Sequence, residues 1–198
     1  MKHTKHVKAA RAFLLAAAAA CLFPTVTAYA IEGWTKVGDE WQYLNREDQP
    51  VTNAFKKSKE DWFYLGDSGF ILKNRIFNFG GDDYYVDQDG RMVKNAWVFI
   101  DSESDPDGAY GEGGWHYFGE DGKGLRAKGK GFRKQVDGKT YAFDENGVMD
   151  SGWWKNDQGT WFHLSTIHDG WFGSMDKGWY HDSADGRWYY LNLLTGAM

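Results

Sequence analysis

The sequence predicts an all-β protein, a solenoid of about seven stacked β-hairpin repeats. Tryptophan and tyrosine each occur 11 times and glycine 25 times among 198 residues, a composition typical of aromatic strands joined by tight turns. A short aromatic motif recurs along the chain, and its copies at Trp41 and Trp62 begin 21 residues apart. Turn-forming residues separate the copies. Because a single hairpin is marginal in water, such hairpins must stack to bury a shared core.

The recurring motif is a four-residue strand, whose first residue we call the anchor. Its clearest copy is residues 188–191, with the sequence WYYL. The fourth residue of every copy is apolar, so we expect it to lie in the core. The anchors are Trp41, Trp62, Asp83, Trp115, Thr140, Trp161 and Trp188, and the fourth residues are Leu44, Leu65, Val86, Phe118, Phe143, Leu164 and Leu191.

A second apolar residue, which we call the leading residue, precedes each anchor. It lies seven to nine residues before the anchor, except in the fourth repeat, where the separation is 18 residues. Turn residues such as 136–138 and 157–159 fall between the two, which predicts that they lie on opposite strands of one hairpin. The leading residues are Trp34, Phe55, Ile76, Trp97, Phe132, Trp153 and Trp179.

The first thirty residues predict a secretory signal that is not part of the fold. Four basic residues accompany an apolar run at 12–22, and residues 28–30 (AYA) form a small-x-small cleavage site. The run is too short to predict a membrane span. Cys21 lies inside this segment, and its lipidation is an alternative, although Ala18 stands where lipoprotein signals usually carry leucine. The chain therefore divides into a signal peptide, 1–30, and a repeat module.

The repeat module, 31–198, is acidic. Without the four basic residues of the signal, 19 of the 23 Lys and Arg remain against 28 Asp and Glu, a net charge of −9. This charge argues against nucleic acid as a partner and suits a cationic ligand or plain solubility. No catalytic motif or metal-ligand spacing appears in the module, and it has no cysteine, so we expect neither enzyme activity nor a cofactor.

Two insertions interrupt the repeats. The first, 101–114 (DSESDPDGAYGEGG), is acidic and could hold calcium, but it lacks the glycine and closing glutamate of an EF-hand loop. We therefore expect a solvated loop and no metal. The second insertion, around 167–172, carries Trp171 and is expected to cover a neighbouring hairpin.

These repeats closely resemble the choline-binding, or cell-wall-binding, repeat family, whose pattern runs from Gly-Trp through Trp-Tyr-Tyr-Leu to a Gly-x-Met turn. Residues 178–179, 188–191 and 196–198 match this pattern in order, and residues 33–34 and 152–153 begin similar units. The resemblance implies that the ligand is choline on teichoic acids at a Gram-positive cell surface. It also implies that each site lies between two hairpins, built from the leading and anchor residues of one repeat and an aromatic residue of the next.

The resemblance predicts four aromatic cages as candidate choline-binding sites. Asp83 and Thr140 depart from the family pattern, so we expect the third and fifth repeats to be structural spacers. Trp179 and Trp188 would complete a site only with another chain, which suggests a homodimer through the C-terminal repeat. The cages are Trp34, Trp41 and Phe63; Phe55, Trp62 and Tyr84; Trp97, Trp115 and Tyr141; and Trp153, Trp161 and Tyr189, with Met175 closing the last.

A quaternary ammonium group has no hydrogen to donate, so its site must use shape and ring faces. Each cation–π contact is worth about 0.5–2 kcal/mol. The same rings could instead serve only as cross-strand pairs, at roughly 0.2–1 kcal/mol each, or stack on glucan beside polar groups such as Asn156 and His163. We interpret the chain as a secreted, non-catalytic cell-wall-binding module for choline, with wall carbohydrate as the alternative ligand.

Overall fold

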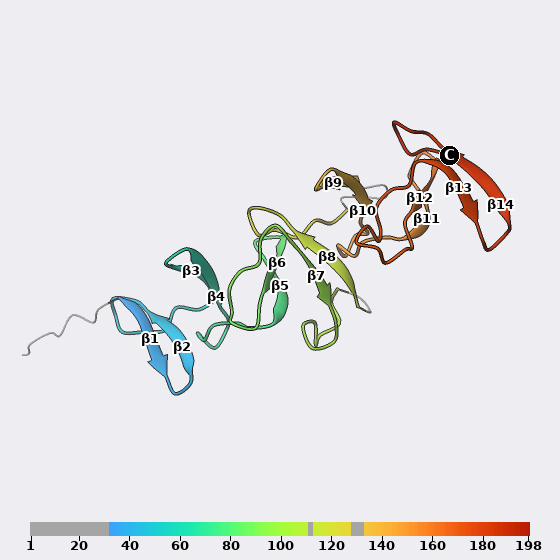
Figure 1. The fold of residues 1–198 in the computed structure, drawn as a ribbon. Coiled ribbons are helices and arrows are strands. Elements are labelled where there is room, and N and C mark those ends of the chain that lie inside the picture. The colour runs from blue at the N-terminus through green and yellow to red at the C-terminus, as the bar shows by residue number, and fades with distance from the viewer. Residues whose placement is uncertain (1–31, 111–112, 128–132) are drawn as a thin grey trace, which may run out of the picture.

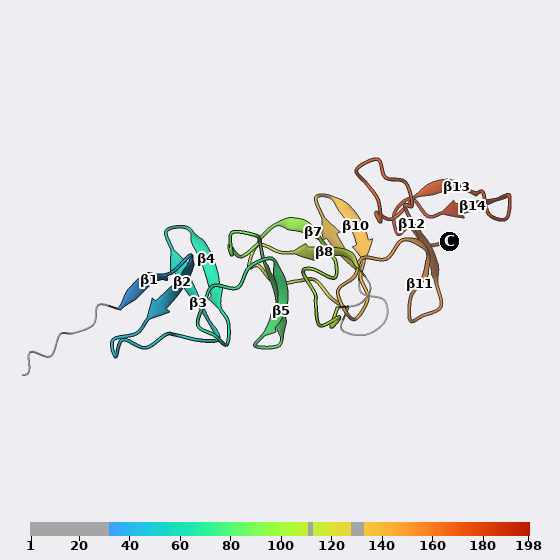
Figure 2. The same ribbon diagram turned by 90° about the horizontal axis from the view of Figure 1, so that it is seen from below.

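The computed structural model describes residues 32–110, 113–127 and 133–198, and over these residues all regular structure is β-strand. Fourteen strands pair as seven separate two-stranded antiparallel hairpins, which confirms the predicted all-β hairpin architecture. The hairpins follow one another along an elongated molecule (Figures 1 and 2). The predicted signal peptide, 1–30, and Phe132 lie outside the described residues. No helix that could span a membrane is found in the part of the chain that the structure describes.

The seven hairpins have strands of four or five residues, joined by short turns except in the fourth hairpin, where the first insertion lies between the strands. They are β1 (Gly33–Val37) with β2 (Glu40–Leu44), β3 (Ala54–Ser58) with β4 (Asp61–Leu65), β5 (Arg75–Phe79) with β6 (Asp82–Val86), β7 (Ala96–Ile100) with β8 (Gly114–Phe118), β9 (Arg133–Val136) with β10 (Lys139–Ala142), β11 (Gly152–Lys155) with β12 (Trp161–Leu164), and β13 (Gly178–Asp182) with β14 (Arg187–Leu191).

The register inside each hairpin puts the leading residue and the anchor on the same face. In the first hairpin Trp34 pairs with Tyr43, the third residue of the motif, and the anchor Trp41 lies two residues away from Tyr43. Because alternate residues of a strand point to opposite faces, these three rings share one face. The second residue of the motif, such as Phe63 in the next hairpin, points to the opposite face. The leading, anchor and third motif positions of each hairpin therefore share one face, and the second motif position lies on the other.

One backbone hydrogen bond links each hairpin, from the second on, to the hairpin that precedes it. After each anchor strand from the second hairpin on, the chain turns back, and one N–H there donates to the anchor carbonyl of the preceding hairpin. These bonds run from Ile71 to Trp41 (3.0 Å), Met92 to Trp62 (2.8 Å), Gly124 to Asp83 (2.7 Å), Met149 to Trp115 (2.8 Å), Met175 to Thr140 (2.8 Å) and Met198 to Trp161 (2.9 Å). We call the donor of each bond the return residue.

Glycine in four of the turns before the return residues leaves room for the return residue of the preceding repeat, at Gly90, Gly122, Gly173 and Gly196. Gly90 has φ +84°, and a Cβ there would lie 2.3 Å from the Ile71 side chain. Gly173 has φ +77°, and its Cβ would lie 2.4 Å from the Met149 sulfur. A side chain at either glycine would both strain the backbone and displace the neighbouring return residue. The Gly-x-Met pattern of the sequence is therefore a packing requirement between successive turns.

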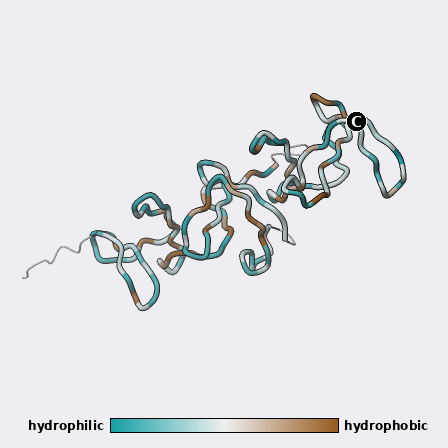
Figure 3. The backbone as a smooth tube through the Cα atoms, in the orientation of Figure 1, coloured by the Kyte–Doolittle hydropathy of each residue, from teal (hydrophilic) through white to brown (hydrophobic). Residues whose placement is uncertain are grey.

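The core is a line of apolar side chains along the axis where hairpins meet. Apolar stretches of the chain gather mainly at these junctions (Figure 3). The fourth motif residues Leu65, Val86, Phe118, Leu164 and Leu191 are completely buried, and Phe143 is 1% exposed, as predicted. Leu44, in the first described hairpin, is partly exposed.

The junction between the third and fourth hairpins is filled by the chain itself. Asp83 occupies the anchor position and is 4% exposed. Its carboxylate accepts hydrogen bonds from Asn78 (2.7 Å) and Tyr110 (3.2 Å) and pairs with the guanidinium of Arg126 at 3.1 Å. These partners compensate the burial of the charge. At this junction the Arg126 guanidinium, a cation of the chain itself, pairs with the Asp83 carboxylate, as expected for a repeat that acts as a structural spacer.

The first insertion is a largely exposed loop, as the sequence predicted, but two of its described polar residues are buried. Ser104 and Asp105 are 2% and 6% exposed. The Ser104 carbonyl accepts a backbone bond from Ile76 (3.0 Å), and Asp105 accepts bonds from the N–H groups of Ala109 and Tyr110. Its acidic side chains are therefore used to close the loop. The described residues hold no cluster of ligands suited to a metal ion.

The junction between the fifth and sixth hairpins is also filled internally. The anchor is Thr140, and the guanidinium of Arg133 lies over the ring of Phe162 at 4.4 Å. Phe162 is 2% exposed. The ring that the pattern would offer to a ligand here already has a cation–π partner from the same chain.

We expect His116 to make the stability of the fold depend on pH. It lies buried in the third junction, its Nε2 has no hydrogen-bond partner, and burial lowers its pKa to about 4. Its pKa in the unfolded chain is about 6.5. The folded state therefore binds fewer protons between these values, so the free energy of unfolding should fall as the pH is lowered through this window, by up to about 3 kcal/mol.

Urea denaturation at pH 7 and pH 4 checks this. The second hairpin has a phenylalanine, Phe63, at the motif position that His116 occupies in the fourth. The variant His116→Phe should lose less stability over the same pH interval. The control is His181→Phe, at an exposed histidine. Equal losses in the wild type and His116→Phe would contradict the assignment to His116.

Candidate functional site

The structure gathers the twelve predicted rings into four hollows between successive hairpins, in the groups that the sequence predicted. Each hollow is lined by the leading and anchor residues of one hairpin and the second motif residue of the next. We call them the first cage (Trp34, Trp41, Phe63), second cage (Phe55, Trp62, Tyr84), third cage (Trp97, Trp115, Tyr141) and fourth cage (Trp153, Trp161, Tyr189). Their placement is as predicted, and their role in binding stays a prediction.

The cages share one geometry. The leading ring meets the ring of the following hairpin edge to face in all four. Ring centroids and interplanar angles are 5.6 Å and 74° for Trp34 with Phe63, 5.0 Å and 63° for Phe55 with Tyr84, 4.8 Å and 62° for Trp97 with Tyr141, and 4.8 Å and 74° for Trp153 with Tyr189. Two rings at a large angle form a corner, which a compact cation can contact on two sides.

The anchor tryptophans complete the corner and leave part of their surface in solvent. Trp41, Trp62, Trp115 and Trp161 are 43%, 36%, 38% and 39% exposed, although tryptophan is usually mostly buried. Nearly equal exposure in four repeats follows from the shared register. Each cage thus keeps one large aromatic face available at an open side.

The return residues supply a fourth, apolar wall that the sequence analysis largely missed. Ile71, Met92, Met149 and Met198 line the first to fourth cages. The assignment of Met175 to the fourth cage was wrong. Its N–H donates to Thr140, and its side chain is buried beside Phe162 in the preceding junction. The period of the methionines was visible in the sequence, but not which junction each one reaches.

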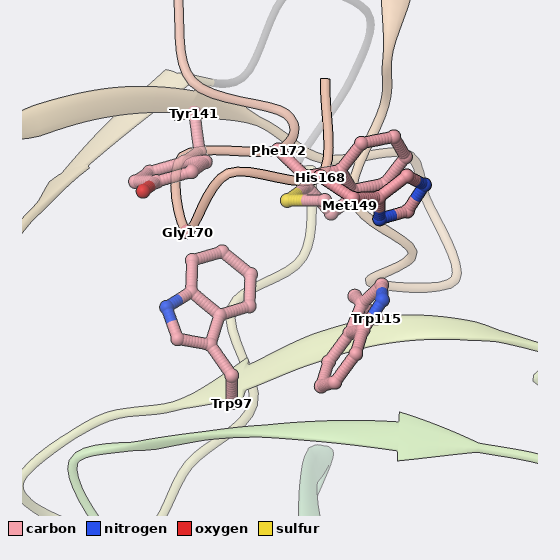
Figure 4. A pocket seen from close by; sticks show the side chains of 7 residues that line it. All are labelled: Trp97, Trp115, Tyr141, Met149, His168, Gly170 and Phe172. Atoms are coloured by element: carbon pink, nitrogen blue, oxygen red, sulfur yellow. The ribbon is translucent and has the colours of Figure 1, made fainter. Parts of the chain in front are cut away.

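The third cage has extra walls from the second insertion. His168, Gly170 and Phe172 line it together with its three rings and Met149. Figure 4 shows Trp97, Tyr141 and Trp115 around the hollow, with the stacked rings of His168 and Phe172 beside Met149. The expectation that this insertion covers a neighbouring hairpin is confirmed, through residues that no motif marked. Only the aromatic content of the insertion could have suggested them.

Sequence comparison identifies the repeats. A family model of cell wall binding repeats matches residues 53–69, which include two rings of the second cage, and residues 177–193, which include β13 and β14. These two segments, of 17 residues each, are similar to that family, and together they cover 34 of the 198 residues of the chain. No protein of curated function matches it in sequence.

Several solved structures have a fold similar to that of this chain. Choline binding protein F of Streptococcus pneumoniae has a TM-score of 0.61 and 23% identity, over 84% of this chain and 51% of that one. The choline-binding domain of CbpL from the same species has a TM-score of 0.61 and 23% identity, over 85% and 78%. CbpJ from Streptococcus pneumoniae TIGR4 has a TM-score of 0.61 and 21% identity, over 84% and 52%. The likeness at these identities shows a shared fold, and the chain spans about half the length of choline binding protein F and CbpJ.

The four cages have the same arrangement of rings, but the charged residues at their rims differ. The first cage is bordered by both signs, with Asp39 and Asp89 against Lys73 and Arg91. The second has Lys94 and Asp121. The third has no Asp or Glu among the described residues that line it. The charged residues that line the fourth are Asp182 and Asp185, and the Lys155 ammonium lies 5.2 Å from the centre of the Trp161 ring.

The carboxylates of the fourth cage are held by its own rings. Asp182 accepts a hydrogen bond from the Trp153 indole N–H at 2.7 Å and another from the Ala184 N–H at 2.8 Å, and these bonds lower the pKa of Asp182. Asp185 accepts a bond from the Tyr189 hydroxyl at 2.5 Å, which raises the pKa of that tyrosine. These hydrogen bonds hold both carboxylates in place at the rim of the cage.

The last hairpin presents its rings to solvent. Trp179 and Trp188 are 69% and 64% exposed, well above the anchors of the four cages. Trp179 packs on Tyr190 at 5.3 Å within its own hairpin, and His181 lies 4.9 Å from Trp188. This face of β13 and β14 is the largest exposed aromatic surface in that hairpin.

We expect the anchor and leading rings of one cage to differ in their effect on stability. Trp161→Ala should lower the free energy of unfolding by less than about 1 kcal/mol, because its ring is 39% exposed. Trp153→Ala should cost about 2–4 kcal/mol, because this ring contacts His163, Tyr180 and Tyr189 and its N–H is paired with Asp182. Urea denaturation measures both, and similar losses in the two variants would show that the anchor is structural.

Proposed function

We propose that this chain is a non-catalytic binding module that attaches to choline displayed on cell-wall polymers such as teichoic acids. The observation that carries the proposal is the repetition of one cage four times, with the same ring corner, the same partly exposed anchor and an apolar return residue. A structure that needed these rings only for packing would have no reason to leave all four anchors open. The similar folds are those of proteins named for choline binding.

The chemistry of a trimethylammonium group fits these walls. It carries a positive charge that it cannot share through hydrogen bonds, so ring faces and a thioether are suitable neighbours. One such cage should bind weakly, at about 1 mM, which corresponds to about −4 kcal/mol. Four cages on one chain would gain roughly a hundredfold or more on a polymer that displays many ligands. Repetition of the hairpin is therefore part of the binding mechanism.

The proposed setting is the outside of a Gram-positive cell, peripheral to its wall. It is supported by the secretory signal predicted at 1–30 and by the two segments similar to cell wall binding repeats. The acidic module would be attracted to a polymer that carries cationic choline groups.

A wall carbohydrate is the second candidate ligand, and the first cage is where it is favoured. Asp39, Ser58 and Gln88 border its rings, so hydrogen-bonding groups lie beside flat aromatic faces. Sugars need both features. Glucan oligosaccharides titrated against the protein, with Trp41→Ala as the matched variant, would separate this ligand from choline.

Retention on a resin that carries quaternary choline groups, and elution with free choline at constant ionic strength, tests the proposal. We expect the protein to elute specifically with choline. Trp41→Ala, Trp62→Ala, Trp115→Ala and Trp161→Ala should each lower the choline concentration needed, since each removes one face of a cage and about 1–2 kcal/mol of cation–π and contact energy. Leu194→Ala, at an exposed apolar side chain that lines none of the four cages, is the control. Elution by ordinary salt alone, with no response to choline, would reduce the binding to net charge and overturn the proposal.

We further propose that the exposed face of β13 and β14 pairs with a second copy of the chain. Trp179 and Trp188 would bury their exposed rings in this contact. Sedimentation equilibrium should show a dimer that Trp188→Ala weakens at least tenfold. A monomer at all accessible concentrations would contradict it.

A further inference from the structure

The third and fourth cages have nearly equal volumes and opposite wall chemistry. Their hollows measure about 360 and 380 Å³. Both have a Trp, Trp, Tyr triad and a methionine, so size and rings do not distinguish them. They differ in what surrounds the triad, which is an aromatic insertion in the third cage and two carboxylates in the fourth.

The insertion that walls the third cage is a closed and ordered loop. Its ends are joined by backbone bonds from Ser165 to Ser174 and from Gly173 to Ser165, both 2.7 Å. Inside it, the Trp171 N–H donates to the Asp169 carboxylate at 3.0 Å. A loop with paired ends and internal bonds holds its shape before a ligand arrives.

Two contacts fix this loop over the third cage. The Lys139 ammonium lies 4.7 Å from the centre of the Trp171 ring. Phe172 packs against the cluster that contains Tyr141 and Met149, and its ring stacks on His168 at 4.1 Å and 10°. The added walls are therefore aromatic and preorganised, and they displace water from one side of the hollow (Figure 4).

The carboxylates of the fourth cage keep capacity to accept further hydrogen bonds. Asp182 accepts from Trp153 and Ala184, and Asp185 accepts from Tyr189 and the Arg187 N–H. A carboxylate offers about four acceptor positions, so each has room for more. Both residues line the hollow. An N–H group of a bound ammonium would find a charged acceptor here.

We propose that the two cages differ in their selectivity for the number of methyl groups on an ammonium ligand. This inference rests on the proposed function. The third cage selects the fully methylated quaternary ammonium. Each methyl that is replaced by hydrogen adds an N–H donor, and none of the described lining residues offers a carboxylate to satisfy it. The fourth cage accepts ammonium groups that carry N–H as well, because Asp182 and Asp185 replace the lost water bonds. Asp182, Asp185, His168 and Phe172 are the specificity-determining residues.

Single-cage variants of the full chain test this. Trp41→Ala, Trp62→Ala and Trp161→Ala together leave the third cage, and Trp41→Ala, Trp62→Ala and Trp115→Ala together leave the fourth. Calorimetric titration with choline, N,N-dimethylethanolamine and ethanolamine gives the ratio of dissociation constants. We expect ethanolamine to bind the third cage at least about 100-fold more weakly than choline does. At the fourth cage, the two ligands should differ in affinity by less than about fivefold.

Two further variants assign the difference to the walls. Asp182→Asn with Asp185→Asn in the fourth-cage variant should raise the ethanolamine-to-choline ratio about tenfold, because a neutral amide accepts N–H bonds more weakly than a carboxylate. Phe172→Ala in the third-cage variant should lower the ratio, because water can then reach the N–H groups. Circular dichroism confirms that each variant is folded.

The outcomes separate the two proposals. If the wild type does not bind choline, the proposed function fails. If both single-cage variants bind choline with equal ratios for the three ligands, the function stands and the methylation inference is overturned. Ratios that differ as expected but do not respond to the Asp182, Asp185 and Phe172 substitutions overturn the assignment to these walls.

Discussion

The hydrogen bond from a return residue to the anchor carbonyl of the preceding hairpin organises this molecule. The seven hairpins share no continuous sheet, and this bond sets how one hairpin sits on the next. It places the return side chain, Met149 for example, beside the anchor ring of Trp115 and against the glycine of the following turn. The same bond therefore positions one wall of every cage and closes the core between hairpins. Binding geometry and fold stability depend on one repeated contact.

The junctions without a predicted cage show that the chain uses the same chemistry internally. Arg126 meets Asp83 in the third junction, and Arg133 lies on Phe162 in the fifth. In both, a cation of the chain occupies the neighbourhood that a ligand cation would take in a cage. An internal partner is always present, so these junctions can be held without a ligand. They separate the cages and stabilise the stack.

The repeat period was enough to predict the hairpins and to group the rings, because strand alternation fixes which face each side chain takes. Trp97 and Tyr141 meet across an insertion of many residues, as the period required. Met175 was predicted at the junction after the sixth hairpin but lies at the junction before it, because the segment that follows each hairpin packs on the preceding hairpin. The repeat period does not show on which neighbouring hairpin that segment packs. Arg126, His168 and the packing of Ser104 depend on how irregular insertions fold, and no local pattern encodes them.

Filled junctions at the third and fifth positions make the steps between neighbouring cages unequal. The first two cages lie at adjacent junctions, whereas a filled junction separates the second from the third and the third from the fourth. A straight polymer whose evenly spaced groups match the step between the first two cages would leave one group unbound at each filled junction. A polymer that engages all four must bend or skip groups between them. The module would thus respond to the flexibility of its partner's backbone as well as to the group it carries.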